Sequence, residues 1–308
     1  MSKAIRVHSY GGPEALVEED VTLGDPGSGQ VRVRVHATTL NHFDVMRASG
    51  VASAMFPLQF PWIPGSDLSG TVEKIGEDVS DLHVGDEIYG FPIAGSYAEQ
   101  ILIDASSIAL KPKNLSHAEA ASISMIGQTA WQALGAAGLA SGQTILVHGG
   151  GGAVGSAAIQ LAKLRGAHVI STASSADAEY VRSLGADEVL DYKTGSFETA
   201  VKNVDVVLDT IGGDTQQKSF GVLKPGGVLA ALNQPPSQEE AAKHGVKAIM
   251  VNANSNTNDL TALKELLEAG QLKVLVGKTY PLSQAADAWR ESESQHVKGK
   301  VVLIVTPN

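Results

Sequence analysis

The sequence predicts an α/β protein with two domains, one a β-barrel and the other built on a doubly wound parallel sheet. The chain has 308 residues, which is enough for about two domains. Up to about residue 113, short strand-like segments are separated by turn signals roughly every ten residues, as in small barrels. From about residue 114 to residue 252, strand and helix patterns alternate, which is typical of a parallel sheet with helices on both faces.

The N-terminal part has the side-chain alternation of half-buried strands. Between Gln30 and Ala37, valines alternate with arginines and other polar residues, so one face of this strand is expected to be apolar. Turns that contain glycine, proline or aspartate separate such segments from one another. The expected strands are Ala4–Ser9, Gln30–Ala37, Leu68–Ile75, Glu87–Tyr89 and Gln100–Ile103.

The remaining part opens with a helix start signal, since Ser116 is followed three residues later by Glu119 in a capping box. The polar tract Gln234–Glu240 is expected to form a mobile surface loop. The expected strands are Thr144–Val147, His168–Thr172, Glu188–Leu190, Val204–Asp209, Val228–Leu232, Lys247–Val251, Lys273–Val276 and Val301–Val305. The expected helices are Ser156–Arg165, Ala176–Leu184, Thr215–Val222, Leu260–Ala269 and Ser283–Glu291.

A glycine-rich turn between the first of these strands and its helix carries the strongest motif. Gly150, Gly152 and Gly155 match G-x-G-x-x-G in the strand–turn–helix context that gives this pattern its meaning. The three glycines allow a tight turn, a close approach of the backbone to a pyrophosphate, and close packing of helix on strand. The N–H groups of the first helical turn, from Ala153 and Val154, then face the phosphates. The alternative is a glycine-rich turn without a ligand.

Composition excludes several classes of protein. The chain is 43% hydrophobic and 18% charged, an ordinary balance for a globular protein with a full core. Its formal net charge of −10 argues against binding to nucleic acid or to an anionic membrane, which needs a basic face. It has no cysteine, so disulfides and thiolate-bound zinc are excluded. The absence of a long apolar run and of a signal-peptide pattern predicts a cytoplasmic protein.

Several motifs along the chain occur together in one order that is typical of a known family. They are FPWIPGSDLSGTVEKIGEDVSDLHVGDEIYGF, GSYAEQILI, ILVHGGGGAVGSAAIQLAK, VVLDTIGG, VLKPGGVL and YPLSQAADAWRESESQHVKGKVVLIV. On these motifs, the chain resembles the zinc-independent branch of the medium-chain dehydrogenase/reductase superfamily, the quinone oxidoreductase and alkenal/enone reductase group. The resemblance implies a GroES-like β-barrel domain formed by residues 1–113 and 258–308, and a Rossmann domain formed by residues 114–257. It also implies a homodimer with cofactor and substrate meeting in the cleft between the domains.

The same resemblance predicts that no metal takes part. Zinc-dependent relatives carry a cysteine where this chain has Asn41, and Gly-His-Glu where it has Gly65–Asp67. They also carry a four-cysteine lobe that this chain lacks. A zinc site needs three or four converging ligands, which His36 and His42 alone cannot supply. Without a Lewis acid, hydride transfer to an activated acceptor is favoured, either a quinone or a C=C bond conjugated to a carbonyl.

The second strand of the Rossmann domain indicates NADP as the coenzyme. NAD-specific domains place an acidic residue at the end of this strand, and the corresponding position is Ala173. A carboxylate there would oppose the 2′-phosphate of NADP. Ser174 and Ser175 can donate to phosphate oxygens, although both also suit a helix N-cap. Tyr192 matches a family tyrosine that contacts the 2′-phosphate.

One departure from the family pattern weakens the expected hold on NADP. Relatives often have a lysine four residues beyond the first serine, where this chain has Ala178. Arg182 and Lys193 are the cations that could replace it.

The resemblance also suggests residues near the reacting groups. Thr129 and Thr210 match positions beside the nicotinamide, and Thr129 could instead be a helix hydroxyl bonded to its own backbone. Asn41 could hydrogen-bond the substrate carbonyl or the nicotinamide ribose. His42 could protonate the enolate left by hydride addition, or be a loop histidine without such a role. Tyr97 is a further catalytic candidate that suits packing equally well.

The sequence therefore predicts a zinc-independent, NADPH-dependent oxidoreductase that acts on quinones or on α,β-unsaturated carbonyl compounds. Two alternatives stay open. One is a nucleotide-binding protein with a redox-sensing or structural, crystallin-like role and little turnover. The other is the reduction of unactivated ketones by a metal recruited elsewhere. Cofactor binding without hydride transfer distinguishes the first, and activity that survives chelators excludes the second.

Overall fold

The computed structural model describes residues 2–293 and 297–306. The chain divides into two compact units. Unit 1 comprises Met1–Met125, Asn254–Gly270 and Val274–Asn308, and unit 2 comprises Ile126–Ala253 with Gln271–Lys273. The long helix α2 (His117–Ala136) spans the division between them, whereas the sequence-based domain boundary precedes this helix. The domain boundaries expected from the sequence stay predictions.

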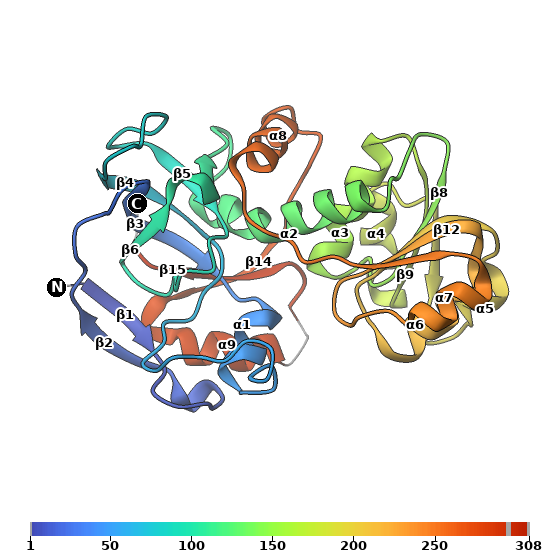
Figure 1. The fold of residues 1–308 in the computed structure, drawn as a ribbon, viewed down its shortest axis with the longest axis horizontal. Helices are drawn as coiled ribbons and strands as arrows, with labels where there is room; N and C mark the ends of the chain where they lie inside the picture. The colour runs from blue at the N-terminus through green and yellow to red at the C-terminus, as the bar shows by residue number, and fades with distance from the viewer. Residues whose placement is uncertain (1, 294–296, 307–308) are drawn as a thin grey trace. The chain divides into compact units, whose positions relative to one another are not determined.

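Unit 1 is dominated by a seven-stranded sheet (Figure 1). Its order is β14-β15-β3-β4-β5-β7, with β6 paired to β3, and β1 and β2 form a separate antiparallel pair. The strands are β1 (Ser2–Arg6), β2 (Val17–Val21), β3 (Gln30–Thr39), β4 (Leu68–Ile75), β5 (Glu87–Gly90), β6 (Gln100–Asp104), β7 (Ile108–Leu110), β14 (Val276–Pro281) and β15 (Lys300–Ile304).

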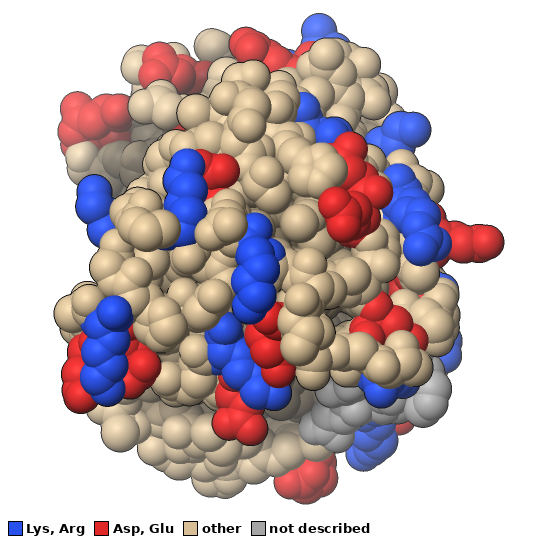
Figure 2. Space-filling model, turned by 90° about the vertical axis from the view of Figure 1, so that its right-hand side faces the viewer, with Lys and Arg blue, Asp and Glu red and all other residues tan. Residues whose placement is uncertain are grey.

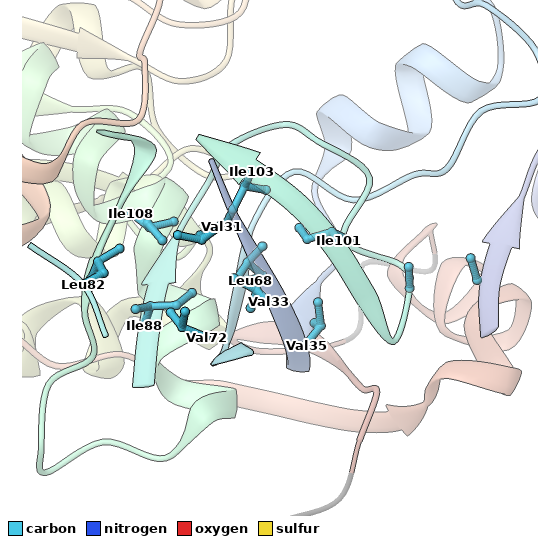
Figure 3. Packing of buried hydrophobic residues seen from close by; sticks show 12 residues of the cluster. Val31, Val33, Val35, Leu68, Val72, Leu82, Ile88, Ile101, Ile103 and Ile108 are labelled. Carbon is cyan, nitrogen blue, oxygen red and sulfur yellow. The ribbon is translucent and has the colours of Figure 1, made fainter. Parts of the chain in front are cut away.

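The alternation in β3 produces the core of this sheet. Val31, Val33 and Val35 are fully buried, and they pack with Leu68 of β4 and Ile101 of β6 (Figure 3). Burying an aliphatic side chain of this size contributes about 1.5–3 kcal/mol. Because the side-chain period of a strand is two, the arginines between these valines lie on the opposite face. The apolar face expected from the sequence is therefore the face that forms the core.

Unit 1 also contains helices, which come from the N-terminal and the C-terminal parts of the sequence. The hydroxyl of Tyr89 donates to the carbonyl of Leu260 at 2.6 Å, which fastens α8 beside the sheet. Trp289 of α9 is fully buried. The helices are α1 (His42–Ala48), α8 (Thr257–Glu268) and α9 (Ala285–Glu293), with 3-10 turns at η1 (Pro13–Ala15), η2 (Ala105–Ser107) and η5 (Leu282–Gln284).

Several expectations for unit 1 were wrong. Helix α1, which begins at His42 shortly after β3, was not predicted from the sequence. Strands β2 and β7 were not predicted from the sequence. The strand expected at Lys273–Val276 instead begins at Val276 and runs to Pro281, because its pairing with β15 starts only there.

Unit 2 contains a six-stranded parallel sheet of order β10-β9-β8-β11-β12-β13. Numbered within this sheet, the order is 3-2-1-4-5-6, that of dinucleotide-binding folds. The strands are β8 (Thr144–Val147), β9 (His168–Ala173), β10 (Glu188–Asp191), β11 (Val204–Asp209), β12 (Leu223–Ala231) and β13 (Lys247–Met250). The helices are α3 (Ala153–Leu164), α4 (Ala178–Ser183), α5 (Phe197–Ala200), α6 (Gly213–Ser219) and α7 (Gln238–His244), with η3 (Ser175–Asp177) and η4 (Phe220–Val222).

Local signals set two helix starts. The capping box that precedes α2 forms as expected, since Ser116 N–H donates to Glu119 Oε2 at 2.9 Å and Glu119 N–H donates to Ser116 Oγ at 3.3 Å. The expected loop Gln234–Glu240 is shorter than predicted, because α7 begins at Gln238. Its start is fixed by Ser237, whose hydroxyl accepts from the Glu240 N–H.

No helix in the described ranges is long and apolar enough to cross a membrane. On the face drawn in Figure 2, acidic and basic side chains are interspersed among uncharged ones. Opposite charges also form ion pairs in the described part of the chain, for example Lys163 with Asp187 at 2.8 Å.

Candidate functional site

The glycine turn of unit 2 joins β8 to α3. Gly149 has φ +70°, a conformation that glycine adopts without steric cost. The Gly150 N–H donates to the carbonyl of Thr172 at 2.9 Å, and the Gly152 N–H donates to the carbonyl of Gly149 at 2.9 Å. These bonds fold the turn against the end of the neighbouring strand β9.

The three motif glycines differ in what surrounds them. A Cβ atom on Gly150 would lie 2.1 Å from Ser171 Oγ, and one on Gly155 would lie 2.2 Å from the Gly149 carbonyl oxygen. Both positions therefore exclude any side chain for packing reasons. Gly152 is exposed, and a Cβ there would meet only the Gly149 carbonyl oxygen, at 3.2 Å. The backbone at Gly152 is thus open to a group approaching from solvent.

Helix α3 begins directly behind this opening. Gly152 is its N-cap and supplies no side-chain hydrogen bond to the first turn. The N–H groups of Ala153, Val154 and Gly155 have no intrahelical acceptor, as at every helix start. Together with the helix dipole they favour an anion at this point. The open glycine and the uncapped helix start fit the diphosphate of a dinucleotide.

The ends of β8 and β11 lie side by side where the strand order reverses, which is where α/β sheets of this type bind ligands. Thr210 follows β11, and its hydroxyl donates to the carbonyl of His148 at 2.8 Å. The buried carboxylate of Asp209 accepts from the N–H groups of Ile211 and Gly212 at 3.0 and 2.9 Å. Asp209 therefore fixes the turn on which Thr210 lies.

His148, between β8 and the glycine turn, is fully buried. Its ring nitrogens lie 3.1 Å from Thr172 Oγ1 and 3.0 Å from Ser219 Oγ. Burial lowers the pKa of His148 to about 4, partly opposed by the charge of Asp209. The ring is neutral at pH 7 and ties β8 to β9 and α6.

The end of β9 gathers the residues expected to contact the 2′-phosphate. The N–H of Tyr192 donates to the carbonyl of Ala173 at 3.3 Å, so Tyr192 lies at this strand end, and the residue is 59% exposed. Ser175 is exposed at the start of η3. The hydroxyl of Ser174 donates to Asp177 Oδ2 at 2.7 Å and is thus already engaged. Thr129 is half-buried on α2.

Unit 1 contains a buried charged cluster, defined here as Asn41, Asp44, Asp67 and Lys300. Asn41 Nδ2 donates to Asp67 Oδ2 at 2.9 Å, and Lys300 Nζ donates to Asn41 Oδ1 at 2.6 Å. Lys300 also donates to the carbonyl of Leu40 at 2.7 Å. The amide of Asn41 therefore bridges an ammonium and a carboxylate inside unit 1.

Burial controls the ionisation of this cluster. It raises the pKa of Asp44 to about 6, a rise that the hydrogen bond from Ser66 opposes and the nearby charge of Asp67 reinforces. Burial also raises the pKa of Asp67, against the opposing charge of Lys300. Burial lowers the pKa of the Lys300 ammonium, and the charges of Asp67 and Asp44 oppose this decrease.

The other two catalytic candidates lie in contrasting surroundings. His42 is exposed in the first turn of α1. Tyr97 is fully buried, its hydroxyl donates to the carbonyl of Thr39 at 3.4 Å, and it accepts from the Trp289 indole at 3.2 Å. This is the packing role that the sequence left open, and the catalytic role of Tyr97 stays a prediction.

Sequence reasoning missed Asp177, Asp44 and Lys300. Lys300 has one visible signal, since it opens an otherwise apolar strand, where a charged residue must be paired if it is buried. Asp177 has none, because its position depends on how the turn after β9 folds. In the described part of the chain, no group of three or more His, Cys, Asp or Glu residues is arranged to hold a metal ion.

Comparisons with known proteins agree with this geometry. Residues 27–113 match the alcohol dehydrogenase GroES-like domain family, and residues 184–303 match the family described as zinc-binding dehydrogenase. The chain is 36% identical to 2-methylene-furan-3-one reductase of Solanum lycopersicum, over 99% of this chain and 79% of that protein. It is also 36% identical to the chloroplastic NADPH-dependent alkenal/one oxidoreductase of Arabidopsis thaliana, over 99% and 80%. The solved quinone oxidoreductase of Coxiella burnetii is 31% identical, with a TM-score of 0.90 over 99% of both chains.

The sheet order and the glycine turn define the class, an oxidoreductase with a nicotinamide dinucleotide domain. The chain belongs to the medium-chain dehydrogenase/reductase superfamily, in its quinone oxidoreductase and alkenal/enone reductase group. The family and the fold predicted from the sequence are confirmed.

Proposed function

We propose that this protein transfers hydride from NADPH to a quinone or to an α,β-unsaturated carbonyl compound, without a metal ion. The observation that carries the proposal is the exposed Gly152 at the uncapped start of α3, in a sheet of dinucleotide-binding order. Two relatives whose names describe enone reduction support the acceptor class. No observation favours the binding-only alternative.

The chain's own residues have two tasks toward the coenzyme, which supplies the hydride when it is bound. The backbone N–H groups of Ala153, Val154 and Gly155 hold the diphosphate, with Gly150 and Gly152 shaping the turn. Tyr192 and Ser175 contact the adenosine end. Thr129 and Thr210 are proposed beside the nicotinamide.

Toward the acceptor, we propose Asn41 as a hydrogen-bond donor and His42 as the proton donor to the enolate. The role of Asn41 follows the family pattern, whereas His42 stands where relatives commonly have a proline. The bonds to Asp67 and Lys300 hold the Asn41 amide in place, and the bond to Asp67 uses one of its two Nδ2 hydrogens. An imidazole side chain can carry a proton and deliver it to an enolate carbon. Holding the two reactants correctly can supply about 7–11 kcal/mol of the barrier by itself, and solvent can deliver the proton.

The proposal that no metal takes part has a physical basis in the charged cluster. The ammonium of Lys300 lies 2.6 Å from Asn41 Oδ1, at a position where zinc-dependent relatives carry a ligand. A second cation there would meet a positive charge at close range. The Lys300 ammonium provides the positive charge that balances Asp67.

The test is an activity screen of purified protein with NADPH against quinones, enals, enones and enoyl thioesters, with and without a strong chelator. We expect turnover with at least one activated acceptor and no effect of the chelator. Tight NADPH binding without turnover on the whole panel would contradict the proposal. Loss of activity on chelation would contradict its metal-free part.

The role of His42 is tested separately with His42→Gln. If His42 donates the proton, kcat falls by about 100-fold or more while the Kd of NADPH is unchanged. An unchanged kcat assigns proton delivery to solvent. The homodimer and the cytoplasmic location stay predictions.

A further inference from the structure

An acidic side chain lies directly against the glycine turn. A Cβ atom on Gly151 would lie 3.1 Å from Asp177 Cβ and 3.2 Å from Asp177 Oδ2. Asp177 is the last residue of η3, in the connection that leaves β9. A carboxylate is therefore present where the sequence, from Ala173 alone, indicated none.

This carboxylate is held in place by its own turn. Ser174 Oγ donates to Asp177 Oδ2 at 2.7 Å, and the Asp177 N–H donates to the carbonyl of Ser174 at 3.0 Å. Ser174 immediately follows Ala173, the last residue of β9. The Ser174 hydroxyl, predicted to bind phosphate, thus orients an anion.

The end of this strand is where dinucleotide domains of this sheet order bind the adenosine ribose. An ionised carboxylate can only accept hydrogen bonds, so it suits the ribose hydroxyls of NADH. The same charge repels the 2′-phosphate of NADPH, which is itself negative at neutral pH. A carboxylate at this position therefore favours the binding of NADH and disfavours the binding of NADPH.

Lys193, a cation near the end of β9, has the opposite effect and favours NADPH. Tyr192 bonds to Ala173, and Lys193 follows it with its ammonium 5.9 Å from the centre of the Tyr192 ring. Lys193 is exposed, so its long side chain is free to turn toward a phosphate. The two charges oppose each other in choosing the coenzyme.

We propose that Asp177 determines the coenzyme preference of this chain. Its carboxylate accepts a hydrogen bond from the adenosine ribose of NADH and opposes the 2′-phosphate of NADPH, so that both coenzymes bind and NADPH is favoured only weakly. This inference rests on the proposed function, and it names a specificity residue that the sequence pattern did not show.

The test is the ratio of the Kd of NADH to the Kd of NADPH, measured by fluorescence titration of purified protein without any acceptor. Asp177→Asn is expected to raise this ratio at least tenfold, mainly through tighter NADPH binding. Lys193→Gln is expected to lower it. Glu179→Gln is the matched control, because it removes the same charge from an exposed position nearby and is expected to change the ratio less than threefold.

A charge-preserving variant separates this role from a structural one. Asp177→Glu keeps the carboxylate and is expected to leave the ratio within threefold of the parent, whereas a structural role would make Asn and Glu equally disruptive. If Asp177→Asn does not fold, Asp177→Ser removes the same charge with a smaller side chain. A ratio unchanged in the folded neutral variant, or an equal loss of both coenzymes, would overturn the inference. Failure of the parent protein to bind either coenzyme would instead overturn the proposed function.

Discussion

The glycine turn of unit 2 and the charged cluster of unit 1 use polar groups in opposite ways. At the start of α3, the first backbone N–H groups have no intrahelical acceptor and no side-chain cap, and the N-cap Gly152 is exposed. In the cluster, the amide of Asn41 and the ammonium of Lys300 bond to groups of the same unit. Donors without an intrahelical acceptor indicate a binding site, whereas polar side chains that bond to one another inside the unit indicate a role in stability.

The difference also has an electrostatic side. The turn holds no formal charge of its own and relies on dipoles, which an arriving anion can use at little cost. The cluster holds buried charges whose desolvation is expensive, so each depends on the others. Substitutions are therefore expected to change binding in one region and folding in the other.

The largest effect is expected for Lys300→Met. Removing the ammonium leaves Asp67 buried and without its balancing charge, which typically costs about 3–5 kcal/mol of unfolding free energy. Denaturant unfolding measures the loss. Lys278→Met on the neighbouring strand β14 is the control, because its ion pair with Glu291 is exposed and little change is expected. A Lys300→Met protein as stable as the parent would show that the cluster does not support the fold.

Asp44 gives unit 1 a stability that falls as pH rises. Its pKa is raised from 3.8 to about 6, so between these values the folded state binds more protons than the unfolded state. At about 1.4 kcal/mol per pKa unit, about 3 kcal/mol is lost between pH 4 and pH 7. The charged groups that interact electrostatically with Asp44 are Asp67, Lys300 and Arg47. We expect Asp44→Asn to gain stability relative to the parent as pH rises, measured by Tm, and a pH-independent difference would contradict this.

His148 gives unit 2 the opposite slope. Its pKa is lowered from 6.5 to about 4, so stability is present above pH 6.5 and is lost as pH falls toward 4. The change is again about 3 kcal/mol. In His148→Gln this pH dependence is expected to disappear, so the variant should compare best with the parent at low pH. Melting curves across this pH range show whether the two units respond with opposite signs.

Gly155→Ala is expected to affect folding least and binding strongly. The added methyl group would lie 2.2 Å from the Gly149 carbonyl oxygen, and overpacking of this kind costs about 1–3 kcal/mol. The displaced turn should weaken NADPH by at least about tenfold, as judged by fluorescence titration. Gly135→Ala on α2 is the control, since a Cβ there meets nothing within 4 Å. Unchanged NADPH affinity in Gly155→Ala would contradict the binding role assigned to the glycine turn.

Sequence reasoning succeeded where one local pattern determines the structure. The valines of β3, the capping box of Ser116 and the strand–glycine–helix unit at Gly150 each depend on neighbouring residues only. The short helix α1 was missed because its seven residues are too few to show a helical period.

The charged cluster was beyond such reasoning for a different reason. Asn41, Asp67 and Lys300 are far apart in the chain, and only the pairing of β15 with β3 brings Lys300 close to the end of β3. Asp177 was missed although it is near the motif, because the fold of one turn places it against Gly151.

The place of β15 in its sheet has a consequence for the order of assembly during synthesis. The strands of unit 2 lie within a single continuous stretch, so its sheet can close while the ribosome is still adding the last residues. The sheet of unit 1 cannot be completed until β15 has been synthesised, because this last strand lies between β14 and β3. Until then, Ala37–Thr39 of β3 lack their partner strand and the carboxylate of Asp67 lacks its counterion. A nascent chain halted before residue 300 therefore has a complete parallel sheet in unit 2 and an incomplete sheet in unit 1.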